Sequence, residues 1–127
     1  MRLLDTDVLV DAVRGFPPAL RWLASLTEQP KISGIVLMEL VEGCANKLEM
    51  LRVQKMVEPY VLCWPVPSDN QNALTILIQA RLSHHIGLQD ALIAATALGL
   101  GATLCTFNTK HFSAVPGLIT EQPYERG

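Results

Sequence analysis

Residues 3–12, LLDTDVLVDA, place two aspartates directly after a short apolar segment and before another one. A carboxylate is rarely buried without a partner, because removing an unpaired charge from water costs free energy. Asp5 and Asp7 are therefore expected to have a function or a partner, and which one depends on how the rest of the chain folds.

Short apolar segments alternate with amphipathic segments along the whole chain. Residues 1–5 predict a strand ending at Asp5, and 6–15 predict a helix with Thr6 as its N-cap and Gly15 as its terminator. The other strands are expected at KISG (31–34), YVLCWPV (60–66), ATLCTFN (102–108) and LIT (118–120). The other helices are expected over 17–28, 35–44, 46–58, 68–85 and 88–101, with a short turn over 109–117. This alternation predicts the α/β class, as a three-layer α/β/α sandwich with a mainly parallel central sheet.

Three of these helices carry further signals. The apolar face of 17–28 is expected to consist of Leu20, Leu23, Ala24 and Leu26. Ser68 and Gln71 have the spacing of a capping box at the start of the following long helix. Residues 88–101 are small and almost all apolar, which indicates a helix that is buried on most sides.

Composition favours one globular domain and gives no overall electrostatic argument for a nucleic-acid partner. The chain has 127 residues and is 50% hydrophobic, so a substantial core is expected within a single domain over 1–127. The formal net charge is -2, so a nucleic acid would need a local basic patch or bound metal ions.

The cysteines indicate a reducing compartment. Cys44, Cys63 and Cys105 are far apart and form no CxxC or Cys/His cluster, so neither a disulfide framework nor structural zinc is expected. Each is expected to behave as a small core hydrophobe. The two aspartates of the opening stretch interrupt the only candidate signal peptide, and glycines cut the longest uncharged run, 91–107. The expected location is therefore the cytoplasm, with no membrane span.

Three carboxylates stand in apolar surroundings in distant parts of the chain. Asp5 ends a strand, Glu39 lies inside IVLMELV, and Asp90 opens DALIAATA. Ligands of parallel sheets bind outside the carboxyl ends of the strands, where Asp5 and Asn108 are both expected. Carboxylates that converge there would repel one another unless a cation neutralised them. Carboxylate oxygens suit Mg²⁺ or Mn²⁺.

Four stretches also occur in a specific order and spacing: LLDTDVLVDA (3–12), LMELVEG (37–43), LQDALIAATAL (88–98) and TLCTFNTKHF (103–112), the last followed by VPGL. They resemble the PIN-domain ribonucleases over nearly the whole chain, and most closely the VapC toxins of prokaryotic toxin–antitoxin pairs. The resemblance implies that Asp5, Glu39 and Asp90 are the acidic metal ligands. Asn108 matches a fourth catalytic position, which is aspartate in many members and asparagine in many others.

The same resemblance implies supporting residues, a reaction and partners. Thr6, Asp7 and Thr106 are expected to support the site, Asp7 by restoring charge or by orienting ligands, and Thr106 through its hydroxyl. The implied activity is Mg²⁺- or Mn²⁺-dependent hydrolysis of an RNA phosphodiester, with tRNA or rRNA as substrate. The implied partners are a VapB-like antitoxin and a second copy of the chain in a homodimer.

Alternatives stay open at this level. Asp5 alone is compatible with an ordinary helix cap, and Asp90 with an acid at the positive end of a helix. The alternative function is a non-catalytic PIN-fold binding module, although such modules typically lose acidic residues that this chain keeps. A haloacid-dehalogenase-type phosphatase is disfavoured, because Leu9 stands at the threonine or valine place of the DxDx[TV] motif.

The remaining polar residues are expected to have ordinary surface roles. Asp11, Glu42 and His111 are expected to face solvent, and His84 and His85 to form a polar helix end. The basic residues of 46–58 are expected to form a solvated face.

Overall fold

Five short strands form one sheet at the centre of the computed structural model, which describes residues 1–126. The strands are β1 (Arg2–Leu4), β2 (Lys31–Ser33), β3 (Leu62–Cys63), β4 (Thr103–Cys105) and β5 (Thr120–Glu121). Their order is β3-β2-β1-β4-β5, and every neighbouring pair is parallel. Leu4 of the central strand pairs with Ile32 on one side and Cys105 on the other. The carboxyl ends of β1, β2 and β4 therefore lie at the same edge of the sheet.

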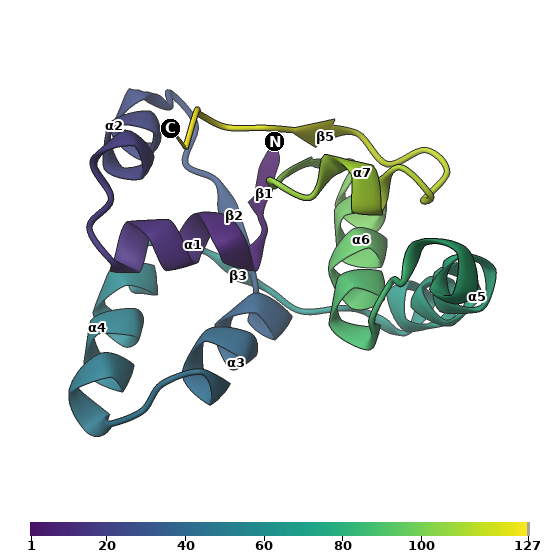
Figure 1. The fold of residues 1–127 in the computed structure, drawn as a ribbon, viewed down its shortest axis with the longest axis horizontal. Helices are drawn as coiled ribbons and strands as arrows, with labels where there is room; N and C mark the ends of the chain where they lie inside the picture. The colour runs from purple at the N-terminus through teal and green to yellow at the C-terminus, as the bar shows by residue number, and fades with distance from the viewer. Residues whose placement is uncertain (127) are drawn as a thin grey trace.

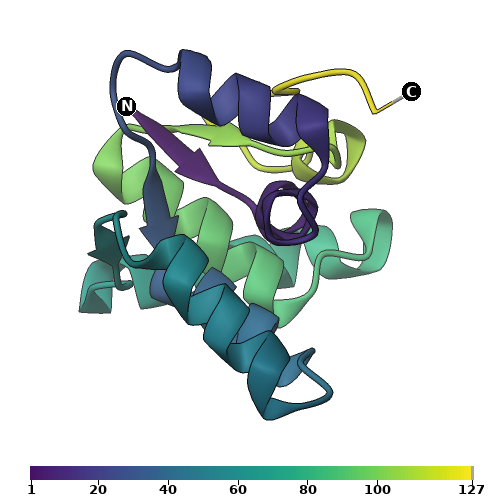
Figure 2. The same ribbon diagram turned by 90° about the vertical axis from the view of Figure 1, so that its left-hand side faces the viewer.

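Helices follow the strands and cover both faces of the sheet. They are α1 (Thr6–Val13), α2 (Pro17–Ser25), α3 (Gly34–Glu42), α4 (Lys47–Val57), α5 (Pro67–His84), α6 (Leu88–Leu100) and α7 (Thr109–Phe112). Figure 1 shows α1, α2 and α4 on one side of the sheet and α5 and α6 on the other, and Figure 2 shows α4 in front and α6 behind. Helix α3 packs against both α1 and α6. The predicted α/β/α sandwich is confirmed, with a sheet that is entirely parallel.

The middle of the core consists of β1, β4 and α6. Leu3, Leu4 and Leu104 have no exposed surface. The buried residues of α6 are Ala91, Ile93, Ala94, Ala95, Thr96 and Ala97. The prediction of a helix buried on most sides is thus confirmed, and it fixes the position of Asp90 at the start of that helix.

The N-cap of α1 is Asp5, so the prediction of Thr6 is wrong. The backbone of Asp5 is extended, and its carboxylate accepts the N–H of Thr6. A carboxylate makes a stronger bond to a backbone N–H than a hydroxyl does, which explains why the aspartate takes the cap position. Gly15 ends this segment as predicted, with a φ of 74° that favours glycine.

The predicted capping box of α5 is also wrong. The N-cap is Val66, and the carboxylate of Asp69 accepts the Val66 N–H at 3.1 Å. Asp69 is buried, so its side chain is held inside the structure instead of at the surface. Ser68 and Gln71 are both exposed and belong to the first turns of the helix.

The predicted apolar face of α2 is only partly right. Leu23 packs against the core, but Leu20 and Ala24 are exposed, and Ala19 is the buried residue of this helix. The helix is turned toward Tyr124, whose ring centroid lies 6.2 Å from that of Trp22. Helical spacing cannot reveal this contact, because Tyr124 comes from the other end of the sequence.

The strands are shorter than the sequence predicts. β4 ends at Cys105 instead of Asn108, because the following backbone turns away from the sheet toward Asp7. β3 covers only two residues, and β5 begins at Thr120. Cys105 is buried as predicted, whereas the other two cysteines are half-buried. Within residues 1–126, no helix is both long enough and apolar enough to cross a membrane.

Candidate active site

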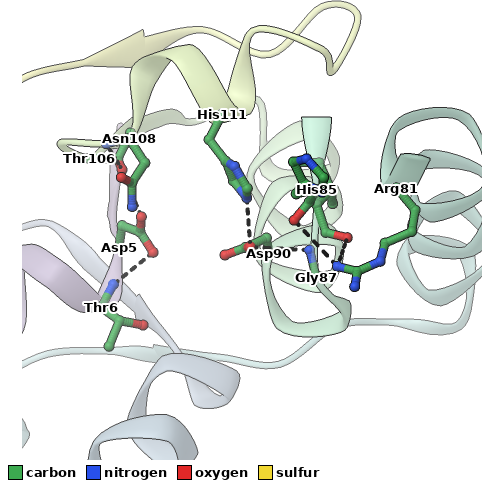
Figure 3. A network of polar contacts seen from close by, with 10 residues as sticks. Asp5, Thr6, Arg81, His85, Gly87, Asp90, Thr106, Asn108 and His111 are labelled. Carbon is green, nitrogen blue, oxygen red and sulfur yellow. Dashed lines mark hydrogen bonds and ion pairs between the residues drawn. The ribbon is translucent and has the colours of Figure 1, made fainter. Parts of the chain in front are cut away.

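Asp5 lies at the carboxyl end of β1 and is bonded to the end of β4. Its backbone N–H donates to the carbonyl of Cys105 at 2.9 Å. Its carboxylate accepts the Thr6 N–H at 2.8 Å through Oδ1 and the Thr106 hydroxyl at 2.7 Å through Oδ2. Figure 3 shows Asp5 between these two threonines. Since only 4% of Asp5 is exposed, its carboxylate is both buried and fixed.

Asp7 holds the loop that follows β4. Its Oδ2 accepts the Phe107 N–H at 2.9 Å, and its Oδ1 accepts the Val8 N–H at 2.8 Å. In the same loop, the Asn108 N–H donates to the Thr106 hydroxyl oxygen at 3.0 Å. Asp7 therefore positions the loop that carries Asn108, in addition to placing a second charge beside Asp5.

Asp90 lies in the first turn of α6 and is fixed from two directions. Its Oδ2 accepts the Gly87 N–H at 3.3 Å and pairs with His111 Nε2 at 3.0 Å. The loop before α6 is itself tied down by Arg81, whose guanidinium donates to two of the loop carbonyls (Figure 3). Asp90 thus acts as a helix-terminal acid, and its side chain lies beside α7.

Glu39 reaches the same region from α3. Its Oε1 is buried and has no hydrogen-bond partner in the described part of the chain, and the same holds for the Thr6 hydroxyl. A buried polar atom without a partner is unusual and costs about 1–3 kcal/mol. A buried carboxylate oxygen without a partner has the chemistry to bind a divalent cation.

These side chains surround one cavity of about 630 Å³. Its charged and amide lining residues are Asp5, Asp7, Asp11, Arg14, Glu39, Asp90, Asn108 and Arg126, together with Thr6 and two apolar residues, Val10 and Phe16. Carboxylates outnumber the two arginines, so the cavity has an excess of negative charge. Every predicted site residue lines it except Thr106, which reaches it through Asp5.

The carboxylates share this cavity without meeting at one point. Among residues 1–126, no three His, Cys, Asp or Glu side chains come together as an assembled metal site. The residues present nevertheless fit a divalent cation in their chemistry. The donors are all oxygens, the charge is in excess, and one Glu39 oxygen lacks a partner.

Burial makes three of these acids costly to ionise. It raises the pKa of Asp5 to about 7, and the charge of Asp7 adds to the effect. Burial likewise raises the pKa of Asp7. Burial also raises the pKa of Glu39, and the charge of Asp90 adds to this rise. The nearby Thr6 hydroxyl lowers the pKa of Glu39 in part, although no hydrogen bond of good geometry joins the two groups. A cation in the cavity would reverse these shifts, because it favours the ionised forms.

Two residues expected at the surface belong to this site, so those predictions are wrong. His111 is bonded to Asp90, as described above. The side chain of Asp11 is only 15% exposed and accepts the Tyr124 hydroxyl at 2.7 Å and Arg126 Nε at 3.0 Å. Glu42 is exposed as predicted.

Sequence reasoning also missed Tyr124 and Arg126. Arg126 donates to the Asp7 carbonyl at 3.2 Å and covers the ring of Phe107 at 4.0 Å. Nothing near these residues in the sequence indicates such contacts. For His111 a signal did exist, since three residues after Asn108 is one helical turn from the candidate site.

Comparisons with known proteins agree with this arrangement. The family of the PIN domain matches residues 2–118. Ribonuclease VapC19 of Mycobacterium tuberculosis (strain ATCC 25618 / H37Rv) is 33% identical over 130 residues, which cover 98% of this chain and 100% of that protein. The tRNA(fMet)-specific endonuclease VapC of Salmonella typhimurium is 31% identical over 125 residues, which cover 94% of this chain and 95% of that protein.

A solved structure is similar over the same extent. A toxin–antitoxin complex from Klebsiella pneumoniae contains a chain with a TM-score of 0.79 and 28% identity, and the match covers 98% of this chain and 99% of that chain. Fold, order of motifs and sequence similarity thus agree over nearly the full length. The chain belongs to the PIN-domain family, among the relatives of the VapC proteins.

Proposed function

We propose that this chain is a metal-dependent endoribonuclease that hydrolyses RNA phosphodiester bonds, and that it is the toxin of a VapBC-type pair. The proposal is carried by the cavity that Asp5, Glu39 and Asp90 line, with its unpartnered Glu39 oxygen among the described residues. The names of the two relatives, a ribonuclease and a tRNA endonuclease, support the same reaction.

Asp5, Glu39 and Asp90 would hold the cation, which we propose to be Mg²⁺ or Mn²⁺ because their donors are carboxylate oxygens. When bound, the cation would supply positive charge to the phosphate and make a water molecule more acidic. Thr106 and Asp7 keep the strand end and the following loop in position. Asn108 adds an amide that donates or accepts a hydrogen bond without adding charge.

In this proposal the acidic side chains orient water for in-line attack on phosphorus, and the leaving group is a ribose oxygen of the RNA strand. No side chain becomes covalently attached to the phosphate. This division of roles is consistent with the burial of Asp5, which accepts two hydrogen bonds and is poorly placed to act as a nucleophile.

The proposed substrate class is tRNA or rRNA, and the proposed partner is a VapB-like antitoxin. The similar proteins support both, since one is named as a tRNA endonuclease and another is a toxin–antitoxin complex. We further propose a single domain over 1–127, a homodimer, and a cytoplasmic location, where both RNA and an antitoxin would be present.

Cleavage of total cellular RNA by the purified chain tests the proposal. Discrete fragments are expected with Mg²⁺ or Mn²⁺ and none with EDTA. Asp5→Asn and Glu39→Gln should abolish cleavage while remaining folded. Glu42→Gln is the matched control, because Glu42 lies on the same helix as Glu39 but is exposed, and it should keep full activity.

The other outcomes separate the alternatives. Activity that survives in Asp5→Asn would indicate a contaminating nuclease or a different site. No cleavage under any condition, from folded chain free of antitoxin, would favour the non-catalytic binding module. Copurification with a small partner protein would support the toxin assignment.

A further inference from the structure

A second cavity, of about 580 Å³, lies beside the acidic one and has the opposite chemistry. It is lined by His84, Phe107, Asn108, Thr109, Lys110 and His111. None of these residues carries a carboxylate, whereas five acids line the neighbouring cavity. Asn108 lines both cavities, so they adjoin at that residue.

The hydrogen bonds that hold the candidate active site also hold the walls of this second cavity. Phe107 and Asn108 are held through their backbone N–H groups by Asp7 and Thr106. The ring of His111 is bonded to Asp90, and it meets the ring of Phe112 edge-on at 5.8 Å. Any group bound there is therefore held at a fixed position relative to Asp5 and Asp90.

Several hydrogen-bond donors remain free in this cavity. Lys110 is exposed, and its ammonium group forms no ion pair within the described residues. His84 uses Nδ1 for a contact with the Ser83 hydroxyl at 2.8 Å, which leaves Nε2 available. The hydroxyl of Thr109 and the side-chain amide of Asn108 add two neutral donors. His111 contributes less, because its Nε2 is already bonded to Asp90.

We infer that this second cavity binds a backbone phosphate of the RNA next to the phosphate that is cut, an inference that rests on the proposed function. An RNA strand that crosses the acidic cavity brings further phosphates with it, and their charge needs cations nearby. Lys110 supplies a cation, and the hydroxyl, amide and imidazole donors are groups that commonly contact phosphate oxygens.

The lining favours a phosphate over a stacked base. A base would need an aromatic face, and Phe107 provides the only aromatic ring in the lining apart from the two imidazoles. The Arg126 guanidinium lies over that ring at 4.0 Å, and the Tyr124 ring meets it at 5.0 Å. With these contacts in place, the polar donors are the groups left to bind RNA.

Binding of a short fluorescein-labelled oligouridylate, followed by anisotropy in EDTA over a range of salt concentrations, tests this inference. Lys110→Gln should weaken binding several-fold at low salt and reduce the slope of log K against log[salt] by about 0.7, the value for one lost contact to a single strand. Lys47→Gln is the control, since Lys47 is exposed on α4 and lines neither cavity. It should leave the slope unchanged.

An oligoadenylate should respond in the same way as the oligouridylate, because a phosphate site ignores the base. Absence of binding by the unaltered chain, or equal losses in Lys110→Gln and Lys47→Gln, would overturn the inference. A loss confined to one of the two RNAs would overturn it too, in favour of a base-binding site. Melting temperatures of both variants should match that of the unaltered chain.

Cleavage assays separate this inference from the proposed function. If RNA is cleaved, Lys110→Gln should raise KM while kcat stays close to its original value. Cleavage with an unchanged KM would refute the phosphate subsite and leave the nuclease proposal intact. Absence of cleavage with a salt slope that still depends on Lys110 would refute the nuclease and leave an RNA-binding surface.

Discussion

Asparagine at position 5 removes one charge from the acidic cavity while keeping the helix cap, and it should make folding stability less sensitive to pH. Burial, and then the charge of Asp7, raises the pKa of Asp5 from its ordinary value of 3.8 to about 7. The folded protein therefore retains a proton that the unfolded chain has already released between about pH 4 and pH 7. At acidic pH the protonated carboxyl of Asp5 costs the folded state nothing, and this stability is lost as the pH rises through this range.

The size of the effect follows from the shift. A rise from 3.8 to about 7 corresponds to about 4 kcal/mol of unfolding free energy that is lost by neutral pH. Asparagine does not ionise, and it caps helices as well as aspartate does. The Thr106 hydroxyl loses a charged acceptor, which costs about 1–2 kcal/mol. Near pH 8, in the absence of divalent cations, Asp5→Asn should therefore be more stable than the unaltered chain by about 2–3 kcal/mol.

Urea unfolding in EDTA, followed by circular dichroism at about pH 5 and about pH 8, measures this difference. The unaltered chain should lose stability between the two values, and Asp5→Asn should lose less. Some loss remains, because burial also raises the pKa of Asp7 and of Glu39. Exposed Glu42→Gln should behave like the unaltered chain. Equal pH dependence in Asp5→Asn and the unaltered chain would refute the assignment of the effect to Asp5.

Three further predictions concern cation binding at Glu39, the packing of Gly99, and the C-terminal tail, residues 120–126. Mn²⁺ without RNA should raise the melting temperature at neutral pH, and less so in Glu39→Gln, because the amide removes the negative charge of the carboxylate that carries the unpartnered oxygen. Calorimetry showing equal rises would exclude Glu39 as a ligand. Gly99→Ala should cost about 1–3 kcal/mol in urea unfolding, because its Cβ would collide with the buried Asp69 carboxylate. Gly43→Ala meets no atom closer than 3.6 Å and should be neutral or stabilising, so equal losses in the two variants would contradict the packing argument. Tyr124→Phe loses a 2.7 Å bond to α1 and should speed amide hydrogen exchange over 120–126, whereas unchanged exchange would show that the aromatic contacts alone hold the tail.

The parts of the fold that depend on local spacing could be predicted from the sequence. The helix over 88–101 and the strand before Asp5 are examples, because their apolar pattern alone decides how they are buried. Helix caps were harder. At α1 the carboxylate of Asp5 caps the helix where the Thr6 hydroxyl is predicted to do so. At α5 the helix is capped two residues earlier than the predicted Ser68, with Asp69 accepting the N–H of Val66. Choosing between two polar neighbours depends on where each backbone group points, and the sequence does not contain that information.

The candidate site could be predicted where its residues interrupt an apolar pattern. Asp5, Glu39 and Asp90 are each conspicuous for this reason, and the structure brings all three to one cavity. Asp11 stands in an amphipathic helix and His111 in a short turn, and in both settings a polar residue is expected to face solvent. Their partners come from distant elements, so only the assembled fold reveals that they are not ordinary surface residues.

Helix capping and a role in the cavity are not competing explanations for the acids at positions 5 and 90. Asp5 caps α1 and Asp90 accepts a backbone N–H at the start of α6, and both also line the acidic cavity. The cap bonds fix each side chain in one orientation, and the positive ends of the two helices offset part of the cost of holding charges close together. A carboxylate oxygen has more than one lone pair, so a cap bond leaves room for a further ligand. The two roles separate in an asparagine variant, which keeps the cap and removes the charge. If Asp90→Asn keeps the stability of the unaltered chain and loses cleavage, the charge of Asp90 acts in the cavity; if it loses neither, the cap is its whole role.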